Sequence, residues 1–193
     1  MTIGERTKSA LQLFSDWRTA AAENPFFGPA LAGAFVVFLL DQLSKFWIVD
    51  VVKLPERVGP CAKNPSALCA QIPVAPIFDL TFVKNTGASF GLGAGSSASR
   101  IILSILVSTV VCGLIAWLGR LQRGYAVIGA AFIIGGAVGN LYDRISYGYV
   151  VDFLDFSGAY FPWVFNVADV AINIGIAFLF LDAFVNRDGT IAT

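Results

Sequence analysis

Four long apolar stretches constrain the fold of this chain more than any other feature. They cover roughly residues 26–49, 99–118, 125–141 and 164–185, and the third is the shortest. Each approaches the ~20 residues with which an α-helix crosses a hydrocarbon core ~30 Å thick. Backbone groups left unpaired in lipid are costly, so stretches of this kind are expected to be helical. The sequence therefore predicts an all-α membrane protein with four transmembrane helices.

The composition restricts the possible chemistry. Charged residues make up only 13% of the chain, against about a quarter in an ordinary soluble domain. The 13 basic residues are balanced by 13 acidic ones, which argues against nucleic-acid binding. Histidine is absent, which excludes histidine-dependent nucleophiles and histidine-ligated zinc. Acid–base chemistry must then rest mainly on carboxylates, lysine or tyrosine, and we expect neither a metal nor another cofactor.

The segments around the apolar stretches define the expected topology. Residues 1–25 form an N-terminal segment, residues 26–185 the membrane domain and residues 186–193 a short tail. Four spans place both termini on one side and two long loops, about 51–98 and 142–163, on the other. Lys and Arg counts are tied between the two faces, but their higher density on the terminal side favours cytoplasmic termini.

The N-terminal segment is polar to mildly amphipathic. Leu13, Phe14, Trp17 and Ala21 recur at helical spacing. This pattern predicts a short helix that lies on the membrane surface. The following apolar stretch is longer than the ~7–15-residue core of a cleaved signal peptide, so we interpret it as a retained anchor.

Polar residues inside the spans gather at one level of the membrane. Such residues are costly in lipid and by default indicate function. The end of the first span, the end of the third and the start of the fourth all lie on the side of the two long loops. These three places carry Asp41, Ser44 and Lys45, then Asn140, Asp143 and Arg144, then Asn166, Asp169 and Asn173.

Asp169 is the strongest candidate among these residues. Asn166, Asp169 and Asn173 lie on one face of one helix. At ~1.5 Å per residue, Asp169 is expected one to two turns inside the fourth span, near the membrane boundary. Its span contains no Lys or Arg, so a neutral form or a partner from elsewhere must accommodate it. These features favour a functional role.

Other polar residues within the spans have structural explanations. Asp41 and Lys45 have the spacing of a helix ion pair, and we favour that interpretation over a chemical role. Asn140 and Asn166 fit hydrogen bonds between helices.

Residues near the membrane boundaries also have ordinary explanations. Asp143 and Arg144 fit a helix cap and an interfacial anchor. Asp182 is placed at the opposite interface, and Asp79 and Asp155 are expected to be solvated loop acids.

Small and aromatic residues complete the pattern. Gly135 and Gly139 in the third span indicate close helix packing. The aromatic residues at the level of the polar cluster fit an interfacial belt, and they are Trp47, Tyr142, Tyr147, Tyr149, Tyr160 and Trp163.

Four motifs, taken in order, resemble the lipoprotein signal peptidase family, also called signal peptidase II. Residues 41–45 read DQLSK, and residues 85–91 read NTGASFG. Residues 135–144 read GGAVGNLYDR and continue through Gly148, Val150, Asp152 and Phe153, and residues 165–169 read FNVAD. The resemblance covers about residues 28–185, and its third and fourth motifs are long and specific.

The resemblance implies an intramembrane aspartyl protease of the bacterial inner membrane. The family removes signal peptides from prolipoproteins whose cysteine carries a diacylglyceryl group, and it cuts just before that cysteine. The expected fold is four transmembrane helices with a small, partly β extracytoplasmic segment between the first two. We expect a monomer that works among membrane lipids with its active site facing the extracytoplasmic side.

Carried over residue by residue, the resemblance implies that Asp152 and Asp169 are the catalytic aspartates. The residues alone single out Asp169, but they do not choose Asp152 over Asp155. Two apposed carboxylates share a proton, so one can activate water while the other polarises the scissile carbonyl. Which of the two holds the proton stays open. The matching site-supporting positions are Asn85, Gly87, Asn140, Asp143, Arg144 and Asn166, and the first-span motif adds Asp41 and Lys45.

A small proton- or ion-coupled transporter is the main alternative. Intramembrane Asp and Lys residues suit it. Only four spans, no visible repeat and polar residues at one face rather than at mid-depth argue against it. A non-catalytic scaffold assembled through the third span would leave Asp152 and Asp169 unexplained.

The stretch 54–76 looks longer and richer in proline than the first outer loop of the family. It contains Cys61 and Cys69 on the side assigned to an oxidising compartment. We therefore predict a Cys61–Cys69 disulfide that closes this loop.

Overall fold

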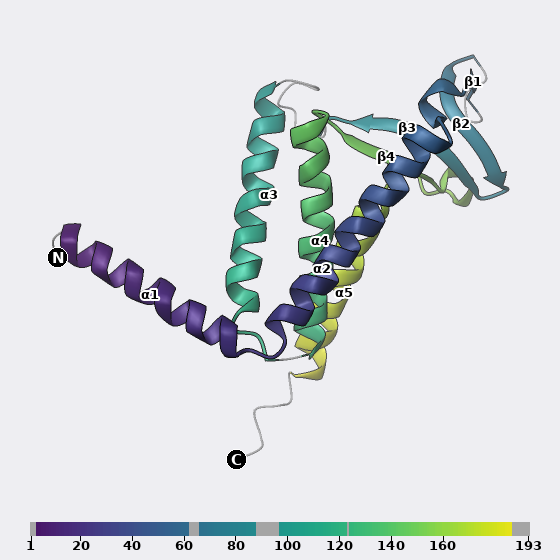
Figure 1. The fold of residues 1–193 in the computed structure, drawn as a ribbon. Coiled ribbons are helices and arrows are strands. Elements are labelled where there is room, and N and C mark those ends of the chain that lie inside the picture. Colours follow the sequence, from purple (N-terminus) through teal and green to yellow (C-terminus); the bar gives the residue numbers. More distant parts are fainter. Residues whose placement is uncertain (1–2, 62–65, 88–96, 123, 187–193) are drawn as a thin grey trace.

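The computed structural model describes residues 3–61, 66–87, 97–122 and 124–186 (Figure 1). The helices in this part are α1 (Ile3–Glu23), α2 (Phe27–Phe46), α3 (Ser97–Leu118), α4 (Gly124–Ser146) and α5 (Val167–Val185). The strands are β1 (Val58–Pro60), β2 (Leu68–Ala75), β3 (Phe78–Asn85), β4 (Val150–Asp155) and β5 (Val164–Phe165). Short helical turns are η1 (Trp47–Val51), η2 (Leu54–Glu56) and η4 (Ser157–Ala159).

Three helices of the described chain, α3, α4 and α5, are each long and apolar enough to cross a membrane. The pair Ser9–Glu23 and Phe27–Glu56 also qualifies by composition, but it is bent by 83°. The structure thus has three candidate spans, or four if the bent pair counts as one. The protein is a mostly helical membrane protein, as predicted.

Helix α4 is the central element and packs against α2, α3 and α5. The space beside Gly135 is filled by the backbone of α2 at Ala34, and the space beside Gly136 by the backbone of α5 at Ala168. A Cβ atom at either glycine would collide with a neighbouring carbonyl oxygen. The close packing predicted for the glycines of this helix is therefore confirmed.

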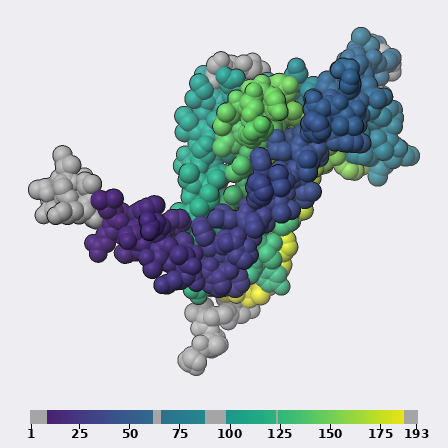
Figure 2. Space-filling model, in the orientation of Figure 1, coloured from purple at the N-terminus to yellow at the C-terminus, as the bar shows by residue number. Residues whose placement is uncertain are grey.

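Helix α1 is bound to the bundle through its C-terminal half. Trp17 Nε1 donates a hydrogen bond to the carbonyl oxygen of Ala116 at 2.9 Å. The side-chain amide of Asn24 donates to the carbonyl oxygens of Leu118 at 3.2 Å and Leu121 at 2.8 Å, beside the C-terminus of α3. Figures 1 and 2 show α1 projecting sideways from the base of the bundle. The predicted helix is present, and its position on the membrane surface stays a prediction.

A five-stranded antiparallel sheet in the order β1-β2-β3-β4-β5 covers one end of the bundle. In Figure 1 it lies at the top, beside the ends of α2 and α4, whereas the α1–α2 junction and the end of α5 lie at the bottom. The prediction placed β structure only in the 51–98 loop, which is wrong in extent. Strands β4 and β5 come from the second loop, because β4 pairs directly with β3.

The ends of the last two spans also differ from the predicted ranges. Helix α4 continues beyond residue 141 to Ser146. Helix α5 begins at Val167, because Val164 and Phe165 pair with β4 and Asn166 forms the N-cap. Asp169 therefore lies in the first turn of α5, rather than one to two turns inside the span.

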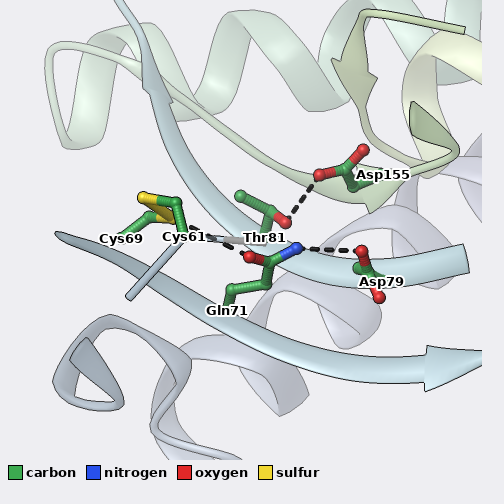
Figure 3. Close-up of a disulfide and its surroundings, with 6 residues drawn as sticks. All are labelled: Cys61, Cys69, Gln71, Asp79, Thr81 and Asp155. Carbon is green, nitrogen blue, oxygen red and sulfur yellow. Dashed lines mark hydrogen bonds between the residues drawn. A yellow bond between two sulfur atoms is a disulfide. The ribbon is translucent and has the colours of Figure 1, made fainter. Parts of the chain in front are cut away.

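The predicted disulfide is present at the outer edge of the sheet. Cys61 and Cys69 are bridged, with their Cα atoms 5.2 Å apart (Figure 3). The backbone N–H of Cys61 also donates to the carbonyl oxygen of Ala67 at 3.0 Å. The bridge therefore links strand β2 to the segment that follows β1.

Two acids expected to be solvated are instead part of this sheet. Asp155 is buried at the end of β4, and its Oδ2 accepts a hydrogen bond from Thr81 Oγ1 at 2.7 Å. Asp79 is half-buried in β3, and its Oδ2 accepts from Gln71 Nε2 at 2.9 Å (Figure 3). The prediction was wrong because loop residues were assumed to face water, whereas they pair across strands.

Candidate active site

Polar side chains from four elements meet where the sheet joins the helical bundle. Strands β3 and β4 contribute one residue each, α4 contributes another, and the N-terminal turn of α5 with its cap contributes two. These residues are Asn85, Asp152, Asn140, Asn166 and Asp169, and hydrogen bonds connect all five.

Asn166 holds both candidate carboxylates. As the N-cap of α5, its Oδ1 accepts from the backbone N–H of Asp169 at 2.9 Å, and Asp169 Oδ2 accepts from the backbone N–H of Asn166 at 3.3 Å. Its side-chain amide donates to Asp152 Oδ1 at 2.6 Å. Asn166 has no exposed surface, so a single rigid residue positions the two acids relative to each other.

Asp152 lies in the middle of β4 and is only 2% exposed. Its second oxygen, Oδ2, accepts from Asn85 Nδ2 on the neighbouring strand β3 at 3.0 Å. Successive side chains of a strand point to opposite faces, so Asp155 points away from the face that Asp152 shares with α5. The alternation of β4 therefore separates the two acids that the residues alone did not distinguish.

The environment of the two carboxylates favours a shared proton. Burial, followed by the nearby charge of Asp169, raises the pKa of Asp152 to about 7. Asp169 occupies the first turn of α5, where backbone N–H groups and the helix dipole favour negative charge. Near neutral pH this arrangement can keep the carboxyl group of Asp152 protonated.

Asn140 connects Asp169 to a second layer of polar residues. Its Nδ2 donates to Asp169 Oδ1 at 2.8 Å. Its Oδ1 accepts from Lys45 Nζ and from Asn166 Nδ2, each at 3.1 Å. Two donors at the oxygen fix the orientation of the amide, so its N–H must face Asp169.

Lys45 lies at the centre of a buried ion cluster. Its Nζ is 2.7 Å from Asp41 Oδ2 and 2.8 Å from Asp143 Oδ2. Asp41 also accepts from the backbone N–H of Ala168 at 2.9 Å, and Asp143 accepts from that of Val151 at 3.1 Å. The helix ion pair favoured from the spacing is present, and the cluster links α2 and α4 to α5 and β4.

Gln42 also belongs to this cluster, although its sequence position alone did not mark it as a candidate site residue. Its side-chain amide donates to Asp41 Oδ2 and to Asp143 Oδ1, each at 3.0 Å. The available signal was its position as a polar residue within the first span, next to Asp41.

Arg144 lies at the edge of the site. Its Nη1 donates to the carbonyl oxygen of Asn140 at 3.2 Å. Within the described residues it forms no salt bridge with a carboxylate, although Asp169 and Asp152 are near enough to interact with it electrostatically. A half-buried guanidinium in this position can bind the backbone carbonyl of a ligand.

Gly87 positions Asn85. It has a φ of +74°, and its backbone N–H donates to Asn85 Oδ1 at 2.9 Å. A Cβ atom at Gly87 would collide with Leu103 of α3. The rest of this motif, residues 88–91, lies outside the described residues.

We expect Gly87→Ala to lower kcat/KM for the reaction at this site by about ten- to a hundredfold, since small displacements of site residues are costly. The left-handed backbone conformation and the contact with Leu103 should shift Asn85 away from Asp152. Gly148→Ala is the matched control, because Gly148 has a φ of +82° but faces the flexible side chain of Arg100. Equal activity loss in both variants would contradict the positioning role of Gly87.

The chain is similar to known proteins over most of its length. A family model described as signal peptidase (SPase) II matches residues 33–185. A lipoprotein signal peptidase of Caulobacter vibrioides is 42% identical over 164 residues, covering 84% of this chain and 90% of that protein. The enzyme of the same name from Pasteurella multocida is 38% identical over 157 residues, covering 79% and 86%.

Two solved bacterial membrane enzymes have a similar fold. One has a TM-score of 0.67 at 22% identity and covers 86% of this chain and 93% of its own. The other has a TM-score of 0.63 at 24% identity and covers 80% and 92%. At this level of identity the similarity supports the fold alone.

Proposed function

The chain belongs to the signal peptidase II family and is a bacterial membrane protease that removes signal peptides from prolipoproteins, and on this premise we propose that Asp152 and Asp169 are its catalytic pair. The observation that carries the proposal is the shared support by Asn166, which binds both carboxylates. Membership of this family also argues against the alternative that the protein is a transporter.

In the proposed mechanism, ionised Asp169 removes a proton from a water molecule that attacks the scissile carbonyl carbon. Asp152 donates its proton to the carbonyl oxygen, which gives a neutral tetrahedral intermediate. Asp169 then passes the acquired proton to the amide nitrogen as the C–N bond breaks, and Asp152 recovers a proton from the hydroxyl group. The raised pKa of Asp152 and the helix N-terminus at Asp169 support this division of roles.

The substrate is proposed to be a prolipoprotein whose cysteine carries a diacylglyceryl group. A cavity of about 320 Å³ borders Asp169 and is otherwise lined mainly by aromatic and aliphatic side chains of the β5 region and α5. Phe161, Trp163, Val170 and Ile174 form much of its wall. An apolar cavity next to a carboxylate suits a substrate whose scissile bond adjoins lipid chains.

A direct test is cleavage by the purified protein in detergent micelles. A prolipoprotein with a diacylglyceryl-modified cysteine should be cut so that this cysteine becomes the new N-terminus. The same precursor without the lipid is the matched substrate and should be cut far more slowly. Equal cleavage of both precursors would contradict the proposed substrate class.

The pH dependence follows from the shared proton. Because the pKa of Asp152 is raised to about 7, the protonated acid persists up to neutral pH and is lost above it. We expect kcat/KM to fall above about pH 7, approaching tenfold per pH unit. The hydrogen bond from Asn85 lowers the pKa of Asp152, so Asn85→Ala should move this alkaline limb to higher pH.

The control for the pH profile is Thr81→Val, which changes a residue that contacts Asp155 rather than Asp152. Its profile should keep the parental alkaline limb. If the alkaline limb of Asn85→Ala moved to lower pH, the proposed effect of Asn85 on the pKa of Asp152 would be contradicted.

We further propose that the protein has four spans in the inner membrane, with the sheet and the site on the extracytoplasmic side and both termini in the cytoplasm. The 1–25 segment and the 186–193 tail are then cytoplasmic. One chain supplies every residue of the site described above, which supports action as a monomer.

The orientation predicts a difference in thiol labelling. In a background with the three native cysteines replaced by serine, Tyr160→Cys should react with an impermeant reagent in intact cells, because Tyr160 is 99% exposed on the sheet side. Gln122→Cys, between α3 and α4 at the opposite end, should react only after lysis. The reverse pattern would invert the topology.

A further inference from the structure

A second cavity lies on the face of β4 that points away from the proposed catalytic pair. It has a volume of about 400 Å³ and is bordered by α2, η1, the end of α4 and the segment that leads into β4. Val151 lines it, whereas the neighbouring Asp152 points to the other face of the strand. The cavity is therefore separate from the catalytic pair, although Gln42 and Lys45 of the buried ion cluster also line it.

Three tyrosines and one acid form the outer wall of this cavity, namely Tyr142, Tyr147, Tyr149 and Asp50. The ring centroids of Tyr142 and Tyr147 are 6.4 Å apart, with an interplanar angle of 84°. Those of Tyr147 and Tyr149 are 6.3 Å apart, with an interplanar angle of 38°. Asp50 is exposed and forms no salt bridge within the described residues. Aromatic faces beside a free carboxylate form a typical environment for an organic ammonium group.

The electrostatic surroundings of Tyr147 agree with this view. Burial, followed by the neighbouring Tyr142, Asp143 and Asp50, raises the pKa of the Tyr147 hydroxyl. Asp143 and Asp50 are thus near enough to act electrostatically on the Tyr147 hydroxyl. Lys45 also lines the cavity, but Asp41 and Asp143 neutralise its ammonium group.

A cation is already in contact with one of these rings. Lys84 Nζ lies 5.0 Å from the centroid of the Tyr149 ring. Lys84 pairs with Val151 across β3 and β4, so it lies on the cavity side of the sheet. The site thus combines an acid and tyrosine faces for a positive group with a nearby lysine for a negative one.

The inner wall of the cavity is apolar and continues onto the outer surface of α2. Leu39, Leu43 and Phe46 line it and are 38%, 60% and 57% exposed. In a membrane-spanning helix, side chains exposed in this way contact lipid chains. The cavity is therefore open to the bilayer at the level where head groups begin.

We propose that this cavity binds a phospholipid with an ethanolamine head group. Its ammonium group lies between Asp50 and the tyrosine rings, its phosphate contacts Lys84, and one acyl chain follows Leu39, Leu43 and Phe46. An interfacial belt would explain the tyrosines alone, but not their arrangement around Asp50 and an open cavity. A phosphatidylglycerol head group lacks the cation that these residues accept.

Native mass spectrometry of the purified protein tests this assignment. The protein is mixed with equal amounts of phosphatidylethanolamine and phosphatidylglycerol that carry identical acyl chains. We expect about a tenfold preference for phosphatidylethanolamine. Asp50→Asn and Tyr147→Leu should each remove most of this preference, whereas the matched controls Glu56→Gln and Tyr160→Leu should keep it, since neither residue lines the cavity.

The experiment does not depend on peptide cleavage, and the inactive Asp152→Asn variant should keep the parental lipid preference. Thermal unfolding of the parent provides a second measurement, in which phosphatidylethanolamine should raise Tm more than phosphatidylglycerol does. Equal binding of the two lipids to the parent, or an equal loss of preference in the control variants, would overturn the proposal.

Discussion

Replacement of either Asp152 or Asp169 by Asn is expected to reduce prolipoprotein cleavage by at least about a thousandfold, because proton transfer by a positioned side chain contributes roughly 10²–10⁴-fold. Asparagine keeps the volume and one acceptor oxygen, with the hydrogen bonds made to that oxygen, but it cannot ionise. Each variant should therefore insert, purify and unfold much like the parent. The measurement is kcat/KM with a diacylglyceryl-modified precursor.

Asp155→Asn is the matched control for this pair. It changes the same residue type on the same strand, but the side chain contacts Thr81 on the opposite face. An asparagine at this position can still bond the threonine hydroxyl, so cleavage should stay near the parental rate. An Asp155 variant as inactive as Asp152→Asn, or a fully active Asp169→Asn, would show that the pair is wrongly assigned.

Lys45→Met is expected to destabilise the protein by about 3–5 kcal/mol, which is typical when one partner of a buried ion pair is removed. The change leaves Asp41 and Asp143 buried without their shared cation, while methionine fills much of the same volume. Chemical unfolding of the purified protein in micelles measures the free energy of unfolding.

A double variant separates this electrostatic cause from a packing defect. Adding Asp143→Asn to Lys45→Met removes one of the two uncompensated carboxylates and keeps an acceptor for the backbone N–H of Val151. The double variant should be more stable than Lys45→Met, although it carries one more substitution. If it is less stable, the charge cluster does not account for the loss.

The helices were predictable because apolar stretches of this length allow few other structures in lipid. The existence of the polar cluster was also predictable, since the parity of the spans places Asp41, Asn140 and Asp169 on one side. Their hydrogen-bond partners were not predictable. The spacing of residues along a helix shows which face of the helix they occupy, but not how one helix is rotated against another.

The strand pairing of the sheet could not be predicted from local sequence. Strand β4 is short and pairs with β3, which lies some seventy residues earlier in the chain, and no local pattern encodes this pairing. Asp152 was therefore identified only through the family resemblance, while Asp155 was wrongly expected to face water. The start of the fourth span was misjudged for a related reason, because Val164 and Phe165 form β5 and the helix begins only at Val167.

The origin of the oxygen atom in the product tests the central claim most directly. The purified protein, in excess over a diacylglyceryl-modified prolipoprotein, completes one turnover in water enriched in ¹⁸O. If Asp152 and Asp169 activate water for direct attack, the released signal peptide carries one ¹⁸O in its new C-terminal carboxylate after that single turnover. A peptide that carries only ¹⁶O, with the label or a covalent adduct on an aspartate of the enzyme, would contradict the account.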